Sequence, residues 1–235
     1  MSFLNDVLNI FIKYYPQLLT GVGNTVLIAL TRTVAGLALG LLTGVVRTAP
    51  MSKNPILRAL HKLLNAIIAI YVEIFRGTPM MVQSLIFYYA IFNLFKRTGM
   101  SVTEINRVWS LFISGLVTVS LNSTAYLAEV LRGGILAVDA GQMEAARSLG
   151  MTHWQAMRRV VFPQAIKNSL PAIGNEFIIN IKDSSVLCVL GVSDLMFMTR
   201  SVAGIYYKGT ECYLIAAIVY LFLTYLSSLL LKAIT

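Results

Sequence analysis

The most informative shortage in this sequence is charge. Only 12% of its 235 residues are charged, about half of the ~25% found in soluble domains, whereas 57% are hydrophobic and the mean hydropathy is +0.74. This shortage excludes an ordinary soluble domain. The net charge of +9 does not indicate a nucleic-acid partner, because Lys and Arg accumulate in the cytoplasmic loops of membrane proteins.

Residues that build metal and catalytic sites are also scarce. The two cysteines, Cys188 and Cys212, lie in or beside apolar segments without metal-ligand spacing. The two histidines, His61 and His153, have no matching Cys, Asp or second His. No phosphate loop of the form G-x-x-x-x-G-K-[S/T] occurs. We therefore predict no catalytic residue, no metal and no cofactor in this chain, and no enzyme activity of its own.

Apolar runs of about 20 residues, the length that crosses a membrane as a helix, recur along the chain. They predict five transmembrane helices, at about 18–46, 56–95, 108–130, 170–190 and 213–231. The second run is too long for one straight crossing, and we interpret it as one broken helix with an interfacial first half as the alternative. The break is placed at 76–79, because Pro79 lacks a backbone N–H and Gly77 permits unusual dihedral angles. The prediction is an all-α polytopic membrane protein with a single domain, residues 1–235.

The distribution of basic residues predicts the orientation. With five crossings, the loop after the first span lies on the same side as the segment after the third. Together with Lys232, that side holds ten Lys and Arg residues against six on the other. Because positive charge marks the cytoplasmic side, we expect the N-terminus outside and the C-terminus in the cytoplasm.

One segment, about 131–165, is too polar to cross a membrane. Two capping-box patterns, which begin at Asp139 and Thr152, predict two short helices. Gly150 suits the end of the first helix, and Pro163 is expected to limit the second. We interpret this insert as a pair of helices joined by a sharp turn in the cytoplasm, where it offers a docking surface.

The spacing within the insert resembles the EAA loop of ABC importer permeases, whose pattern is E-A-A-x₃-G-x₉-I-x-L-P. The matching residues are Glu144, Ala145, Ala146, Gly150, Val160, Phe162 and Pro163, with Val and Phe in place of the usual Ile and Leu. GVGNT (21–25), YVEIFRGTPMMVQ (71–83) and LPAIGNEFIINIKDSS (170–185) resemble the polar amino-acid uptake branch of that family.

The resemblance implies a type I ABC importer permease in the bacterial inner membrane, working by alternating access. Its partners would be a dimer of ATPase subunits that bind ATP and Mg, an identical or similar second permease, an extracytoplasmic substrate-binding protein and an amino-acid substrate. The insert would be the coupling helix that docks on the ATPase. The expected coupling residues are Glu144, Ala145, Ala146, Leu149, Gly150, Met151, Trp154 and Pro163.

Charged residues inside membrane segments are costly and indicate function. Polar residues cover an arc of the fourth span, and the RGTP break adds further donors. The candidate substrate path comprises Asn175, Glu176, Asn180, Lys182, Asp183, Ser184, Arg76, Gly77, Thr78 and Pro79. Lys182 or the donors of the break would receive the substrate carboxylate, and Glu176 or Asp183 its ammonium. The alternative is that these charges form structural pairs. We assign Arg32, Asn122 and Glu129 to helix packing.

A secondary transporter or channel not driven by ATP is the alternative function, because it also uses broken helices and membrane charges. The insert argues against it, since such a protein has no need of a docking loop. Both signs of charge occur on the fourth span, so the sequence leaves open which amino acid is carried. It also leaves open whether the second permease is identical.

Overall fold

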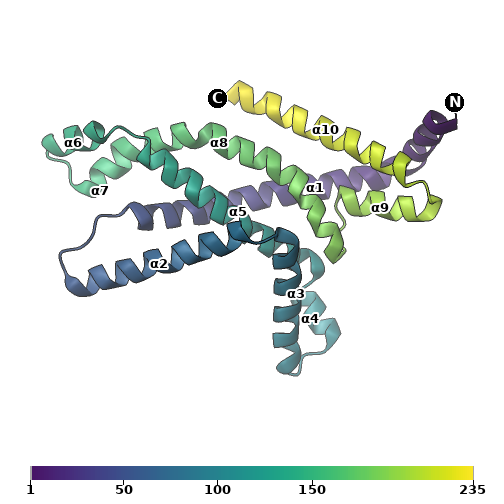
Figure 1. The fold of residues 1–235 in the computed structure, drawn as a ribbon, viewed down its shortest axis with the longest axis horizontal. Coiled ribbons are helices and arrows are strands. Elements are labelled where there is room, and N and C mark those ends of the chain that lie inside the picture. Colours follow the sequence, from purple (N-terminus) through teal and green to yellow (C-terminus); the bar gives the residue numbers. More distant parts are fainter. Residues whose placement is uncertain (1, 235) are drawn as a thin grey trace.

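The computed structural model describes residues 2–234, and all regular structure in that range is helical (Figure 1). The elements are α1 (Ser2–Thr48), α2 (Pro55–Gly77), α3 (Met80–Arg97), α4 (Val102–Val108), α5 (Leu111–Leu136), α6 (Ala140–Ser148), α7 (His153–Ala156), a π-helical turn (Met157–Val161), α8 (Phe162–Asp183), a 3₁₀ helix (Ser184–Leu190), α9 (Leu195–Tyr206) and α10 (Gly209–Ile234).

Four of these helices, α1, α2, α5 and α10, are each long and apolar enough to cross a membrane. Residues 153–190 and α9 form a bent pair, with an angle of 51°, that adds a fifth crossing if it is counted as one span. The predicted all-α polytopic architecture is confirmed.

The centre of the fold is the contact between α1 and α5. Small residues on α1 let the two backbones approach closely. A Cβ atom added at Gly36 would lie 2.8 Å from Leu127 Cδ1, and one at Gly40 would lie 3.1 Å from the Ala128 backbone nitrogen. Asn180 of α8 joins this pair, since its Nδ2 donates to Thr33 Oγ1 at 2.9 Å. The three helices form a packed unit to which the other elements attach.

The predicted break at 76–79 coincides with the end of α2 at Gly77 and the start of α3 at Met80. The interpretation as one crossing by a broken helix stays a prediction: α2 alone is long enough to cross a membrane, and α3 leaves its end at a steep angle (Figure 1). Gln83 stabilises the break: its Nε2 donates to the carbonyl oxygen of Phe75 at 2.9 Å and to Thr78 Oγ1 at 2.7 Å. A carbonyl left open at the end of α2 thereby finds a partner.

Several helix boundaries differ from the predicted ones. Helix α1 begins at Ser2 rather than near residue 18, so it is about 70 Å long at ~1.5 Å per residue, well beyond a membrane's thickness. Helix α5 begins at Leu111, capped by Ser110, and continues to Leu136. Helix α8 begins at Phe162, eight residues before the predicted span. The added helical turns mix polar with apolar residues, so they extend beyond the continuous apolar runs from which the spans were predicted.

The prediction that Pro163 limits the second insert helix is wrong. Pro163 lies inside a continuous helical segment, since Val161 before α8 is itself helical, with φ −75° and ψ −48°. The π turn widens the helix at this point, because the Phe162 N–H bonds to the Met157 carbonyl oxygen, and so it accommodates the N–H that proline lacks. The helix therefore runs from the insert into the membrane without interruption.

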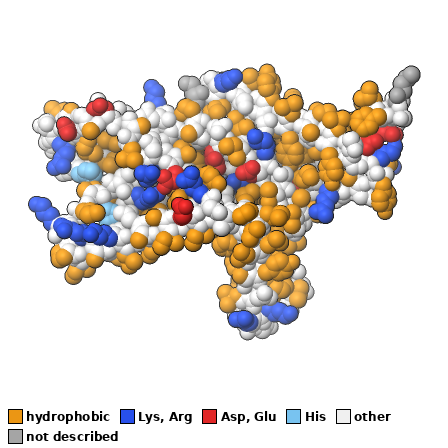
Figure 2. Space-filling model, viewed as in Figure 1, with side chains coloured by type: hydrophobic (Ala, Val, Ile, Leu, Met, Phe, Trp, Pro, Cys, Tyr) orange, Lys and Arg blue, Asp and Glu red, His pale blue; other side chains and the backbone are white. Residues whose placement is uncertain are grey.

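The ends of the molecule differ in character. Helices α6 and α7 lie at one end of its long axis beside the connection between α1 and α2, whereas α9 and the N-terminal part of α1 lie at the other (Figure 1). Hydrophobic side chains cover much of α2 and α3, and a group of basic and acidic side chains lies between α2 and α8 on the face shown (Figure 2).

Candidate functional site

The turn of the insert has the predicted geometry. Helix α6 ends in a Schellman motif, in which Gly150 N–H bonds to the Arg147 carbonyl at 3.0 Å and Met151 N–H to the Ala146 carbonyl at 3.2 Å. Gly150 has φ +83°, a conformation that costs other residues energy. Thr152 then begins α7 with a complete capping box. The two helices and the sharp turn between them are confirmed.

The other capping box is only half formed. Asp139 caps α6 by accepting the Gly141 N–H at 2.7 Å. The side chain of Gln142 does not complete the box: its Oε1 accepts from Gln164 Nε2 at 3.2 Å, so it joins the insert to the start of α8.

The insert presents a protruding surface around this turn. Leu149 is 81% exposed and Trp154 is 56% exposed, and Glu144, Ala145 and Gly150 are also exposed. Ala146, in contrast, is buried. Two large apolar side chains held in solvent beside a small-residue helix form a surface suited to a protein partner.

The inner face of the insert is anchored to the transmembrane helices. Met157 and Val161 are buried with Ile135 of α5 and Ala165 of α8. Trp154 is outside this core and faces a groove formed with the ends of α1 and α2, which include Val46 and His61. The insert therefore has one anchored face and one free face.

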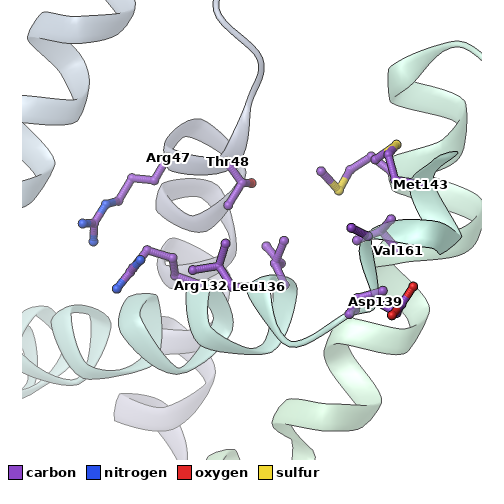
Figure 3. A pocket seen from close by; sticks show the side chains of 11 residues that line it. Arg47, Thr48, Arg132, Leu136, Asp139, Met143 and Val161 are labelled. Carbon is purple, nitrogen blue, oxygen red and sulfur yellow. The ribbon is translucent and has the colours of Figure 1, made fainter.

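A crevice of about 270 Å³ separates the insert from the ends of α1 and α5 (Figure 3). Thr48 and Leu136 line one side, and Met143 and Val161 of the insert face them. Beside it, Glu129 forms ion pairs with Arg47 of α1 and with Arg132, the latter at 3.0 Å. Glu129 thus ties α1 to α5 where the insert joins the membrane domain, in agreement with its assignment to helix packing.

A second cavity, of about 340 Å³, lies within the membrane domain. This volume is near the lower end of the ~300–1,000 Å³ range of small-molecule sites. Its walls come from four separate helices and from the break between α2 and α3. The lining residues are Arg32, Thr78, Pro79, Met80, Asn122, Tyr126, Glu176, Ile179 and Asp183.

Both signs of charge meet in this cavity. Arg32 is 1% exposed and its Nη2 lies 3.7 Å from Asp183 Oδ2 and 3.4 Å from Asn122 Oδ1. Glu176 is 8% exposed and lines the same cavity. A cavity with a guanidinium and two carboxylates can bind a ligand that itself carries both charges.

The predicted path residues do not form one cluster. Thr78, Pro79, Glu176 and Asp183 lie together in the cavity. Asn175 and Lys182 are exposed on α8, so they point away from it.

The remaining predicted residues have other neighbours. The Arg76 guanidinium lies over the Tyr126 ring, 5.4 Å from its centroid, and Gly77 has open space around it. Asn180 bonds to Thr33, and Ser184 donates to the carbonyl of Ile181 at 2.9 Å. Asn180 thus joins α8 to α1, whereas the Ser184 bond stays within its own helical segment.

Five residues that line the cavity were absent from the predicted path: Arg32, Asn122, Tyr126, Met80 and Ile179. The first two had been assigned to packing, yet both line the cavity. Asn122 lines the cavity and also packs helices together, because its Nδ2 donates to the Phe75 carbonyl oxygen at 3.1 Å and to Gln83 Oε1 at 3.0 Å. The cost of an arginine inside an apolar span was the signal that could have identified Arg32.

A helical membrane domain with a charged internal cavity, joined to a protruding insert that offers a protein-docking surface, defines the class of membrane permeases that work with a soluble partner. Comparison with known proteins specifies the family. Residues 36–235 match the model of the binding-protein-dependent transport system inner membrane component, and the chain belongs to this family. It is a permease subunit of an ABC importer.

Individual relatives cover nearly the whole chain. The probable amino-acid permease protein YxeN of Bacillus subtilis is 35% identical over 93% of this chain and 90% of its own length. The glutamine transport system permease protein GlnP of Escherichia coli K12 is 31% identical over 92% and 90%. A crystal structure of an amino acid ABC transporter with histidines matches with a TM-score of 0.78 at 37% identity, covering 95% of both chains.

A more distant structure supports the fold alone. The inward-facing MetNI methionine ABC transporter matches with a TM-score of 0.72 at 21% identity, over 95% of this chain and 98% of that chain. The type I importer permease fold predicted from the sequence is confirmed, and the secondary transporter or channel is not favoured.

Proposed function

We propose that this chain forms the translocation path for an amino acid in an ATP-driven importer. The observation that carries the proposal is the cavity in which Arg32, Glu176 and Asp183 meet inside the membrane domain. An amino acid carries a carboxylate and an ammonium, and this cavity offers a partner to each. The names of its relatives, which include amino-acid and glutamine permeases, support the same substrate class.

The motor is a separate subunit. The insert would dock through the exposed surface around Leu149 and Trp154 onto an ATPase dimer, which would bind the ATP and Mg and supply the catalytic residues. The ion pairs of Glu129 and the anchored core beside them support transmission of ATPase movement to α1 and α5.

The assembly contains further partners. An extracytoplasmic binding protein would deliver the substrate. Residues 1–235 would form one membrane domain, and a second permease, identical or similar, would complete the path. The excess of basic residues beside the insert supports an N-terminus outside and a C-terminus in the cytoplasm. ATP-driven closure would open the path outward, and hydrolysis would return it inward.

The experiment that tests this function is uptake by the reconstituted complex of permease, ATPase and binding protein in proteoliposomes. Amino-acid uptake should require ATP inside the vesicle and persist without any ion gradient. Uptake that follows an ion gradient and survives the removal of ATP would contradict it.

Two cavity variants test the site itself. Glu176→Gln and Asp183→Asn keep the side-chain size and remove a charge, so each should reduce uptake by about tenfold or more, the value of one charge-assisted hydrogen bond. Asn175→Ala, an exposed position on the same helix, is the matched control. Normal uptake by both cavity variants, with normal copurification of the ATPase, would refute the assignment.

A further inference from the structure

Arg32 stands out among the cavity residues because most of its donors have no partner. Its side chain is 1% exposed, and its Nε and Nη1 make no hydrogen bond within residues 2–234. Only Nη2 has polar neighbours, at 3.4 Å and 3.7 Å. Both distances exceed the ~2.7–2.9 Å of a charge-assisted hydrogen bond.

Such an arrangement is costly unless a ligand completes it. Unsatisfied donors in an apolar environment cost free energy, and a charge within a membrane adds to that cost. Glu176 lines the same cavity, yet no ion pair joins it to Arg32 in the part of the chain that the structure describes. Asp183, the carboxylate paired with Arg32, has a side chain that is 44% exposed and hence accessible to exchange.

The other cations near the cavity are less suitable. Lys182 is exposed and does not line the cavity. Arg76 is also exposed, and the ring of Tyr126 already occupies one face of its guanidinium. Arg32 is therefore the cation whose free donors are enclosed by the cavity walls.

From this geometry we propose that Arg32 is the specificity-determining residue that binds the α-carboxylate of the substrate. A guanidinium presents a planar fork of N–H donors that matches a carboxylate in a bidentate arrangement. With the carboxylate on Arg32, the substrate ammonium lies among Glu176 and Asp183, the acidic walls of the cavity. This inference rests on the proposed amino-acid function, and it replaces Lys182 and the 76–79 break as the carboxylate partner.

The test is equilibrium binding to the purified permease–ATPase complex without the binding protein, whose own selectivity would mask that of the cavity. The probes are L-glutamine, L-histidine and L-glutamate, each compared with its own α-amide, which lacks the α-carboxylate charge. The wild-type complex should bind at least one acid about tenfold to a hundredfold more tightly than its amide, the range expected for hydrogen bonds to a charged group.

Substitution of Arg32 should abolish this preference. Arg32→Gln should weaken binding of the acid about tenfold or more and leave binding of the amide within about twofold, because only the acid loses a charged partner. Arg32→Lys should keep part of the preference, since an ammonium retains the charge but not the fork. Lys182→Gln, on the exposed side of α8, should keep it entirely.

The outcomes separate the two proposals. If Arg32→Gln copurifies with the ATPase and keeps the acid-over-amide preference, or weakens acid and amide equally, the role of Arg32 is overturned. If the wild-type complex binds none of the probes, the amino-acid function fails, and the role of Arg32 fails with it.

Discussion

Gly150 is the position at which a single substitution should separate coupling from folding. Its φ of +83° closes the turn between α6 and α7, and a Cβ atom added there would have no neighbour within 4 Å. An alanine at this position would therefore meet no steric clash. Its cost would be the left-handed backbone conformation alone, about 1–2 kcal/mol for a residue with a side chain.

This free-energy cost should destabilise the turn that forms the docking surface and leave the stability of the membrane domain unchanged. About 1–2 kcal/mol lowers the population of the formed turn by a factor of about 5–30. Gly150→Ala should therefore weaken ATPase binding by up to that factor. Gly150→Asn should be milder, because Asn tolerates this conformation. Gly150→Val should be more severe, because a β-branched residue tolerates it least.

The assay combines ATPase affinity, measured by titration of the permease in detergent, with substrate-stimulated ATP hydrolysis by the reconstituted complex. Thermal unfolding of the permease is the folding control, and its midpoint should stay close to that of the wild type. The reasoning would be refuted if Gly150→Val bound and stimulated the ATPase normally, or if the order Asn, Ala, Val were not followed.

Two further predictions use matched positions. Gly21→Ala should lower the thermal midpoint by the equivalent of about 1–3 kcal/mol, because its Cβ would lie 2.8 Å from the Leu195 Cα. Gly23→Ala, which has open space around it, should be neutral or slightly stabilising. Equal midpoints for the two variants would contradict the close packing of α1 and α9. Glu129→Gln should destabilise the complex and reduce coupling, since it removes two partly buried ion pairs. Asp6→Asn removes the more exposed pair with Lys208 and should cost less than about 1 kcal/mol of stability. A larger loss of thermal stability in Asp6→Asn than in Glu129→Gln would contradict this prediction.

The insert was the part of the site most accessible to sequence reasoning. Its information is local, since a capping residue, a glycine at the turn and the spacing between them lie within about twenty residues. Thr152 and Gly150 adopt the predicted roles because caps and left-handed turns depend on neighbouring backbone atoms. Pro163 was misread because the π turn before it depends on the packing of Met157 and Val161 against α5.

The residues of the membrane cavity could be predicted from the sequence only in part. Helical periodicity placed Glu176 and Asp183 on a polar arc of α8, but it assigned Lys182 and Asn175 to the same arc. Which part of an arc faces a cavity depends on the neighbouring helices, and these come from distant segments. Arg32 lies about 150 residues from Asp183 in the chain, and only the fold brings Nη2 to 3.7 Å from its carboxylate.

The sequence by itself determined that this protein crosses a membrane several times as helix, that a polar insert leaves the membrane, and that the insert matches a docking loop. These properties follow from hydropathy, capping and spacing, which act over one helix or one turn. The tertiary structure decided that α2 ends where α3 turns away, that the insert continues into α8, and that Arg32 faces the cavity rather than a helix interface. Each of these depends on packing between segments far apart in the chain, which no local pattern contains.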